Sequence, residues 1–185
     1  MVPLGFRKVA KSVITKLVFN LIIIGSSTLL GNHMANRYVQ RVRQLHILQI
    51  CIAKLETEII YYSTFLPEAL KNVGIGIDGV IGEFLCEVSS ILQDKHSASI
   101  KNAWEKALET KKKNMDINEE DREIIERFGS QLGLADIKVQ RQLFELTQAQ
   151  LYRQGERAEE DRIKYAKLYK SLGFLSGLTI VIILL

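Results

Sequence analysis

Residue types that build most metal, redox and catalytic sites are scarce in this sequence. Its 185 residues include two cysteines and three histidines. Cys51 and Cys86 belong to neither a CxxC motif nor a Cys/His cluster, so both are predicted to be small buried side chains in a reducing compartment, not disulfide partners. His33, His46 and His96 are isolated and share no spacing typical of metal ligands. The sequence therefore argues against a metal centre and against a disulfide-stabilised fold.

Motifs for nucleophilic, metal-assisted or phosphate chemistry are also missing. There is no Walker loop, no nucleophile elbow and no HExxH motif. The carboxylates lie on predicted helices among lysines and arginines, where ion pairs and solvent account for them. We expect no catalytic residues, no metal ligands and no cofactor, and we expect the protein not to be an enzyme.

One glycine-rich stretch matches the form of a dinucleotide-binding loop. Gly74, Gly76 and Gly79 give a G-x-G-x-x-G pattern, and Asp94 follows further along the chain. That fingerprint requires a β-strand before it and a βαβ unit around it. Here residues 67–73 are predicted to be helical and no βαβ pattern follows, so a loop between two helices is favoured over nucleotide binding.

Proline is as scarce as cysteine. Only Pro3 and Pro67 occur, so long uninterrupted helices are allowed. Val, Ile and Thr form no regular period-two runs, which argues against a β-sheet. The sequence predicts an all-α fold: a cytoplasmic bundle of about five to six helices, flanked by an N-terminal and a C-terminal transmembrane helix.

The central region shows helical spacing from residue 38 onward. The first predicted helix covers residues 38–65, a second begins near Pro67, and a third covers residues 80–93. The apolar positions of the first recur every three or four residues: Val42, Leu45, Leu48, Ile52, Leu55, Ile59 and Tyr62.

The next two predicted helices have recognisable starts. Ser97 or Ser99 is placed to cap a helix that carries Trp104, which we interpret as a core anchor. Asn118 is predicted to cap the following helix, whose first residues are acidic and therefore suit the positive end of the helix dipole. That helix is expected to end near Gly129 or Leu132.

The last predicted helix of the central region covers residues 135–170. Its apolar stripe is expected at Leu143, Leu146, Ala149 (or Gln150) and Tyr152. Residues 155–164, GERAEEDRIK, are mostly charged and are interpreted as an exposed helical stem, with a partner contact as the alternative.

An apolar segment near the N-terminus, residues 17–35, is long enough to cross a membrane. It carries no fixed charge, and a helical span needs ~20 apolar residues. Arg7, Lys8, Lys11 and Lys16 precede it within a basic tail, residues 1–16. A cleaved signal peptide has the same general shape, but no clean small-x-small cleavage site precedes a polar mature start. We therefore favour a membrane anchor and keep the signal peptide as the alternative.

A second apolar segment, residues 171–185, is short for a full crossing. Lys167 and Lys170 can reach the interface with their long side chains, and Tyr165 and Tyr169 suit the headgroup region. A helix of a soluble core is the alternative, although this charge-free run is followed by nothing that would cover it.

Both apolar segments contain small residues four positions apart. Ser27 and Gly31 share one face of the first, and Gly173 and Gly177 share one face of the second. This spacing lets membrane helices approach closely. The general frequency of glycine in membrane helices is an equally good explanation of the pattern.

Two crossings would divide the chain into a tail (1–16), a membrane helix (17–35), a central helical domain (36–170) and a second membrane helix (171–185). Lys164, Lys167 and Lys170 crowd the inner flank of the second segment, so the positive-inside rule places the central domain in the cytoplasm. The net charge of +4 is modest and its excess flanks the apolar segments. Membrane lipid is therefore expected as a partner, and nucleic acid is not.

Four stretches in order resemble one family, stage III sporulation protein AB of endospore-forming bacteria. They are RQLHILQICIAKLETEIIYYSTFLPEAL (43–70), NAWEKAL (102–108), FGSQLGLADIKVQ (128–140) and KLYKSLGFLSGLTIVIILL (167–185). The resemblance covers residues 35–185, and its last stretch is the most specific. The chain departs from the family at its start, where residues 1–16 precede the first apolar segment.

The resemblance implies a function that composition alone does not. The family is similar at fold level to the cytoplasmic domains of type II secretion platform proteins. It implies a membrane platform in the mother-cell membrane around the forespore, which helps to assemble the channel complex linking the two cells. The implied partners are the secretion-type ATPase, stage III sporulation protein AA, and the other proteins of that complex. The sequence sets no oligomeric state, and self-association is among the arrangements open to it.

Candidate partner-binding residues come from three places in the central domain. They are Pro67, Glu68 and Leu70 near the second helix, Glu119, Glu120 and Asp121 at the acidic helix start, and Phe128, Leu132, Gly133, Asp136 and Gln140 in one resembling stretch. Charge reversal of the acidic three is expected to weaken ATPase association without unfolding the domain. The alternative function is a membrane-anchored regulator or chaperone that binds a client helix in a groove.

Overall fold

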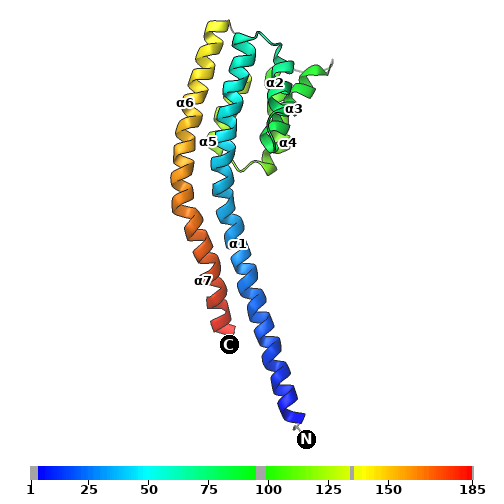
Figure 1. The fold of residues 1–185 in the computed structure, drawn as a ribbon, viewed down its shortest axis with the longest axis vertical. Helices are drawn as coiled ribbons and strands as arrows, with labels where there is room; N and C mark the ends of the chain where they lie inside the picture. Colours follow the sequence, from blue (N-terminus) through cyan, green and yellow to red (C-terminus); the bar gives the residue numbers. More distant parts are fainter. Residues whose placement is uncertain (1–3, 95–98, 134–135, 185) are drawn as a thin grey trace. The chain divides into compact units, whose positions relative to one another are not determined.

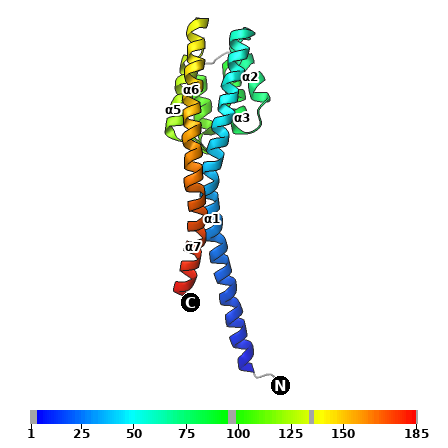
Figure 2. The ribbon, with the colours of Figure 1, turned by 60° about the vertical axis from the view of Figure 1, so that its left-hand side comes forward.

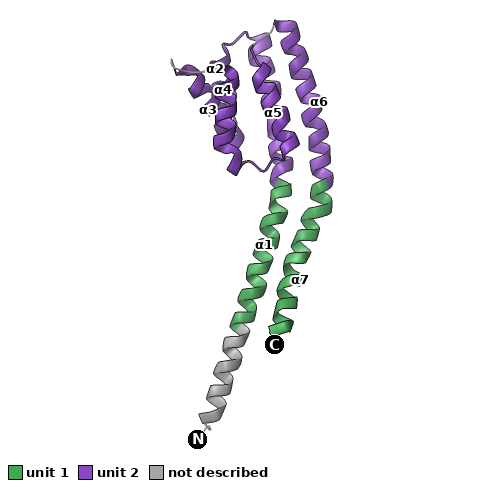
Figure 3. Ribbon diagram, turned by 180° about the vertical axis from the view of Figure 1, so that it is seen from behind, with its two compact units in different colours: residues 1–39, 161–185 green, residues 40–160 purple. Residues whose placement is uncertain are grey.

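The computed structural model describes residues 4–94, 99–133 and 136–184, with side chains described from Val18 onward within these ranges (Figure 1). The described residues are helical and contain no β-strand, which confirms the predicted all-α class. The chain forms two compact units, residues 1–39 with 161–185 (unit 1) and residues 40–160 (unit 2) (Figure 3).

Unit 2 is a helical bundle. It contains the end of α1 (Leu4–Glu56), a π-helical turn η1 (Thr57–Tyr61), and α2 (Leu66–Ile75), α3 (Val80–Gln93), α4 (Ile100–Lys111), a 3-10 turn η2 (Lys112–Asn114), α5 (Glu119–Gln131) and α6 (Ile137–Asp161). Helices α2 to α5 each pack against the next in the sequence. The bounds of α3 match the prediction, and Pro67 lies in the first turn of α2, as expected.

Unit 1 contains the N-terminal part of α1, a π-helical turn η3 (Arg162–Ala166) and α7 (Lys167–Leu184). Its two helical arms lie side by side in both views (Figures 1 and 2). The α-helix α1 is continuous from Leu4 to Glu56, so the helix predicted to begin at residue 38 begins earlier in the chain. The expected Ser97 cap, His96 and Ala135 lie outside the described residues.

A row of aromatic rings forms the centre of unit 2. Trp104 of α4 contacts Phe84 of α3 and Phe128 of α5 edge to face, with ring centroids 5.1 and 5.7 Å apart. Phe128 in turn meets Phe144 of α6 at 5.3 Å. Edge-to-face pairs at this distance add to the stability that burial alone gives. Trp104 is therefore the predicted core anchor, and the row joins four helices.

The glycine-rich stretch is a tight connection between α2 and α3, as predicted. Gly79 has a φ of +92°, a conformation that residues with a Cβ rarely adopt. A Cβ on Gly82 would clash with the carbonyl oxygen of Ile77. The glycines are thus explained by a sharp turn and a close helix approach.

The buried face of α1 follows the predicted spacing over most of its length. Leu45, Leu48, Ile52 and Leu55 are buried, but Tyr62 is 71% exposed. The α-helix ends at Glu56 and the helical backbone ends at Tyr61, so the periodicity no longer applies to Tyr62.

The predicted stripe on α6 is wrong except at Leu143. Leu146 is 52% exposed and Tyr152 is 59% exposed, and Ala149 also faces solvent. The buried face instead alternates steps of four and three residues along the helix: Gln140, Phe144, Thr147, Leu151, Gln154 and Ala158. This is the narrow seam of a coiled coil. Half of its positions are polar, so hydrophobicity alone selected the wrong face.

Candidate functional site

Small residues hold the two arms of unit 1 in close contact. A Cβ on Gly31 would lie 2.8 Å from the Cα of Gly173, and one on Gly177 would lie 3.0 Å from the Cα of Ile24. The Ser27 hydroxyl donates a hydrogen bond to the Gly173 carbonyl at 2.6 Å. The structure thus brings together all four predicted helix-packing residues, and it shows that they pack against each other within one chain.

Both arms of unit 1 belong to helices that are long and apolar enough to cross a membrane. Their most apolar windows have mean hydropathies of 1.2 and 1.5, and only 11% and 17% of these windows is buried. Leu29 is 71% exposed and Ile183 is 77% exposed. A helix of a soluble core would bury most of such a window, so this exposure argues against the core-helix alternative for the second segment.

An aromatic cluster lies next to these apolar segments in unit 1. The ring of Tyr38 lies 5.5 Å from that of Tyr165 and 5.7 Å from that of Tyr169. Burial raises the pKa of the Tyr38 hydroxyl above its ordinary value, and the hydrogen bond to Tyr169 raises it further. Lys164 lies over the Tyr165 ring at 5.1 Å. Tyrosines with nearby lysines are typical of the membrane–water interface.

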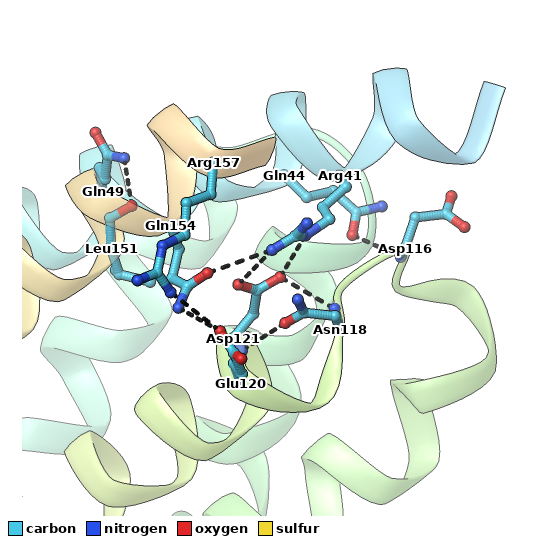
Figure 4. A network of polar contacts seen from close by, with 10 residues as sticks. All are labelled: Arg41, Gln44, Gln49, Asp116, Asn118, Glu120, Asp121, Leu151, Gln154 and Arg157. Atoms are coloured by element: carbon cyan, nitrogen blue, oxygen red, sulfur yellow. Dashed lines mark hydrogen bonds and ion pairs between the residues drawn. The ribbon is translucent and has the colours of Figure 1, made fainter. Parts of the chain in front are cut away.

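At the acidic start of α5, Asp121 forms a buried structural joint in unit 2 (Figure 4). Asn118 caps the helix as predicted: its side chain accepts from the Asp121 backbone N–H, and the Asp121 carboxylate accepts from the Asn118 N–H at 3.0 Å. The same carboxylate accepts from Arg41 Nε at 2.8 Å and from Nη2 at 3.2 Å. Asp121 is fully buried, so it ties α5 to α1.

Polar side chains from α6 complete this network. Gln154 accepts from Arg41 and donates to Glu120 at 3.0 Å, and Arg157 lies 3.4 Å from the Glu120 carboxylate. Thr147, whose hydroxyl donates to the Leu143 carbonyl at 2.8 Å, and Gln154 are therefore hydrogen-bonded within the α6 seam. These bonds offset the usual cost of burying a polar side chain. The network specifies how α1, α5 and α6 meet.

One end of unit 2 carries an exposed apolar surface. Tyr62 and Phe65, between η1 and α2, are 71% and 73% exposed, and Ile137 at the start of α6 is 63% exposed. Arg141 lies 5.5 Å from the centroid of the Tyr61 ring, which brings the two segments together. We call this surface the end face and define it by Tyr61, Tyr62, Phe65, Gly133, Asp136, Ile137 and Arg141.

Neither cysteine forms a disulfide. Cys51 is buried in unit 2, and burial raises the pKa of its thiol to about 11. Cys86 is half-buried, so the expectation of buried cysteines is met fully only at Cys51. Within the described residues, no three His, Cys, Asp or Glu side chains are grouped so that they could hold a metal ion.

Comparison with known proteins identifies the family. A sequence profile for stage III sporulation protein AB matches residues 16–185. The chain belongs to the stage III sporulation protein AB family. It is 31% identical over 170 residues to stage III sporulation protein AB of Bacillus subtilis (strain 168), covering 92% of this chain and 99% of that one. It is also similar to a solved structure of a stage III sporulation protein AB, with a TM-score of 0.63 and 27% identity over 68% of this chain and 98% of the other.

The stretches that resemble the stage III sporulation protein AB family mainly supply residues that pack inside the fold. The second contains the core residue Trp104, and the last contains the whole of α7, including Gly173 and Gly177. The first and third meet at the end face, because a Cβ on Gly133 would lie 3.3 Å from Leu66.

Six of the eleven candidate partner-binding residues cannot present their side chains to a partner while unit 2 is folded. They are Pro67, Leu70, Asp121, Phe128, Leu132 and Gln140, all buried. This corrects the prediction at those positions, since a resemblance does not separate core residues from surface residues. The remaining five are exposed: Glu68, Glu119, Glu120, Gly133 and Asp136.

The end-face aromatics are the residues that sequence reasoning missed. The helical periodicity places Tyr62 in a buried stripe and predicts no contact for Tyr61 or Phe65. A signal was available, because Ser63, Thr64 and Pro67 interrupt the helix there. Ser63 has a φ of +54°, so the chain turns sharply and the aromatics around it leave the core face.

Proposed function

We propose that this chain is a non-enzymatic membrane platform of the sporulation channel complex that links mother cell and forespore. It works with a secretion-type ATPase, stage III sporulation protein AA, and with other proteins of the same complex. Helices α1 and α7 anchor it in the mother-cell membrane around the forespore, with unit 2 in the cytoplasm. Family membership and the two apolar helices support this proposal.

The observation that carries the proposal is the end face. A cluster of exposed aromatic and aliphatic side chains marks an interaction site, because a partner that covers it removes apolar surface from water. Aromatic residues and arginine are also the side chains that contribute most to protein–protein binding, and Tyr61 and Arg141 already lie together here. Glu68 is exposed near the start of α2, and Asp136 is exposed in the end face itself. An apolar centre with charged residues nearby is the usual composition of an interface.

The cytoplasmic placement of unit 2 rests on charge. Lys164, Lys167 and Lys170 are exposed beside the apolar part of α7. The positive-inside rule places such lysines on the cytoplasmic side, where an ATPase would meet the end face.

The test is a binding titration of the full chain in lipid nanodiscs with purified stage III sporulation protein AA. The double variant Tyr62→Ala/Phe65→Ala removes two exposed rings, and Leu146→Ala is the matched control because it is an exposed apolar side chain of α6 outside the end face. We expect about tenfold or greater loss of affinity in the double variant, since hot-spot truncations cost ~2 kcal/mol, and less than about twofold in the control.

Two results would count against the proposal. Equal affinity for the double variant and the control would exclude the end face as the ATPase contact. Absence of saturable binding by the wild-type chain would reject the ATPase partnership itself.

A further inference from the structure

A groove between α1 and α6 in unit 2 is separate from the end face. It has a volume of about 480 Å³. Helix α1 contributes Val42, His46 and Gln49, and the α6 wall extends from Tyr152 to Glu160. The two helices are joined beneath it by hydrogen bonds of Gln49 and Gln148, at 3.1 and 3.0 Å. The α6 residues that line the groove are Tyr152, Gly155, Glu156, Glu159 and Glu160, and none of them belongs to the end face or to the Arg41–Asp121 network.

The groove exists because the seam between the two helices is narrow and one position beside it lacks a side chain. Gly155 lies on the α6 wall, and a Cβ there would be 3.1 Å from Nε2 of Gln49. Any larger side chain at Gly155 would therefore project into the groove. The α6 positions on either side of the seam are not covered by α1, because only every third or fourth residue of α6 is buried in the seam.

The α6 wall of the groove is acidic. Glu156, Glu159 and Glu160 line it. Glu156 and Glu160 are exposed, one helical turn apart, and neither has an ion-pair partner within 4.0 Å among the residues that the structure describes. Like charges at this spacing disfavour the helix, whereas a cation between them would relieve the repulsion.

The other end of the groove is apolar. Tyr152 is 59% exposed and Val42 is half-buried. From Tyr152 to Glu160 the α6 wall extends ~12 Å, at 1.5 Å per residue. That length matches two turns of a second helix. An occupant would place an apolar side chain against Tyr152 and cations beside Glu156 and Glu160.

We propose that this groove docks a helix from a partner protein that carries Lys or Arg one turn apart, followed by an apolar residue. The charge complementarity selects a cationic helix, and the apolar end sets its direction along the groove. This site is additional to the end face, so one platform chain contacts two partners, or two parts of one partner, on different surfaces.

The experiment uses the full chain in nanodiscs of zwitterionic lipid and a fluorescein-labelled helical peptide of about 15 residues, long enough to form a helix. The peptide carries lysines four residues apart and one leucine, and a matched peptide carries glutamates in place of the lysines. Binding is measured by fluorescence anisotropy. Glu156→Gln/Glu160→Gln removes two groove charges, and Glu123→Gln/Glu145→Gln removes two exposed charges outside the groove.

We expect saturable binding of the lysine peptide, weakened about tenfold by the groove pair and less than about twofold by the control pair. Gly155→Leu should abolish binding without changing any charge, with Trp104 fluorescence confirming that unit 2 is folded. Tyr62→Ala/Phe65→Ala should leave peptide binding unchanged, which separates this site from the end face.

Three outcomes would overturn the proposal. The first is no saturable binding of the lysine peptide, and the second is an equal loss in the groove and control pairs. The third is a wild-type dimer that becomes monomeric in Glu156→Gln/Glu160→Gln, because the groove would then be occupied by a second copy of this chain.

Discussion

Replacing Asp121 by alanine distinguishes a structural joint from a partner contact at the start of α5. The Asp121 carboxylate is fully buried and accepts two hydrogen bonds from Arg41 and one from the Asn118 backbone. The variant would leave Arg41, whose side chain is 11% exposed, without this carboxylate. Breaking a buried ion pair from one side costs about 3–5 kcal/mol, and loss of a helix cap costs about 0.5–2 kcal/mol.

These two costs share one side chain and are not additive, so we expect a loss of about 3–5 kcal/mol in the free energy of unfolding of unit 2. Domains of this kind are stable by about 5–15 kcal/mol, so a loss of this size is a large share of the stability of unit 2. The charge-reversed triple variant of Glu119, Glu120 and Asp121 would therefore destabilise unit 2 strongly instead of only weakening a contact.

The assay is urea unfolding followed by tryptophan fluorescence. Trp104 is the only tryptophan and is 2% exposed in the core of unit 2, so its emission reports on this unit. Glu119→Ala is the control, because the Glu119 side chain is 75% exposed and its loss should cost less than about 1 kcal/mol. Arg41→Met/Asp121→Leu should recover most of the loss, since apolar side chains can replace a buried pair. A loss of stability in Asp121→Ala no larger than in Glu119→Ala would refute the reasoning.

Two further predictions concern close contacts. Gly129→Ala should destabilise unit 2 by about 1–3 kcal/mol in the same urea assay, because its Cβ would clash with the Trp104 ring. A free energy of unfolding equal to that of the wild type would contradict this, because the core would then accommodate the added methyl group by repacking. In unit 1, Ser27→Cys/Ser176→Cys should form a disulfide on mild oxidation in membranes, since the two hydroxyl oxygens are 2.7 Å apart. Adding Gly173→Leu should abolish that cross-link by forcing α1 and α7 apart, and an undiminished yield would contradict the packing.

Local signals in the sequence predicted those parts of the structure that depend on neighbouring residues. The bounds of α3, the Asn118 cap and the turn at the glycine-rich stretch follow from propensity and from short-range hydrogen bonds. The packing of Ser27, Gly31, Gly173 and Gly177 was also predictable, because small residues four apart leave a smooth helix face.

The remaining features depend on contacts between distant residues. Asp121 appeared to be one of three equivalent surface acids, because its partner Arg41 is 80 positions away in the sequence. The buried face of α6 contains Gln140, Thr147 and Gln154, which a search for apolar periodicity rejects. The groove beside it depends on Gly155 facing Gln49 across two helices, and no pattern within either helix indicates this.

The proposed platform requires unit 2 to lie in the cytoplasm, and cysteine labelling in intact cells tests this most directly. Cys51 and Cys86 would first be replaced by alanine, and a single cysteine would then be placed at the exposed Ser90 of α3 or at Leu184 near the end of α7. With the chain expressed in vegetative cells, where it would lie in the plasma membrane, we predict that a membrane-impermeant maleimide labels the cysteine at 184 in intact cells. The cysteine at 90 should be labelled only after permeabilisation. Labelling at 90 in intact cells would contradict the cytoplasmic placement, and with it the ATPase partnership.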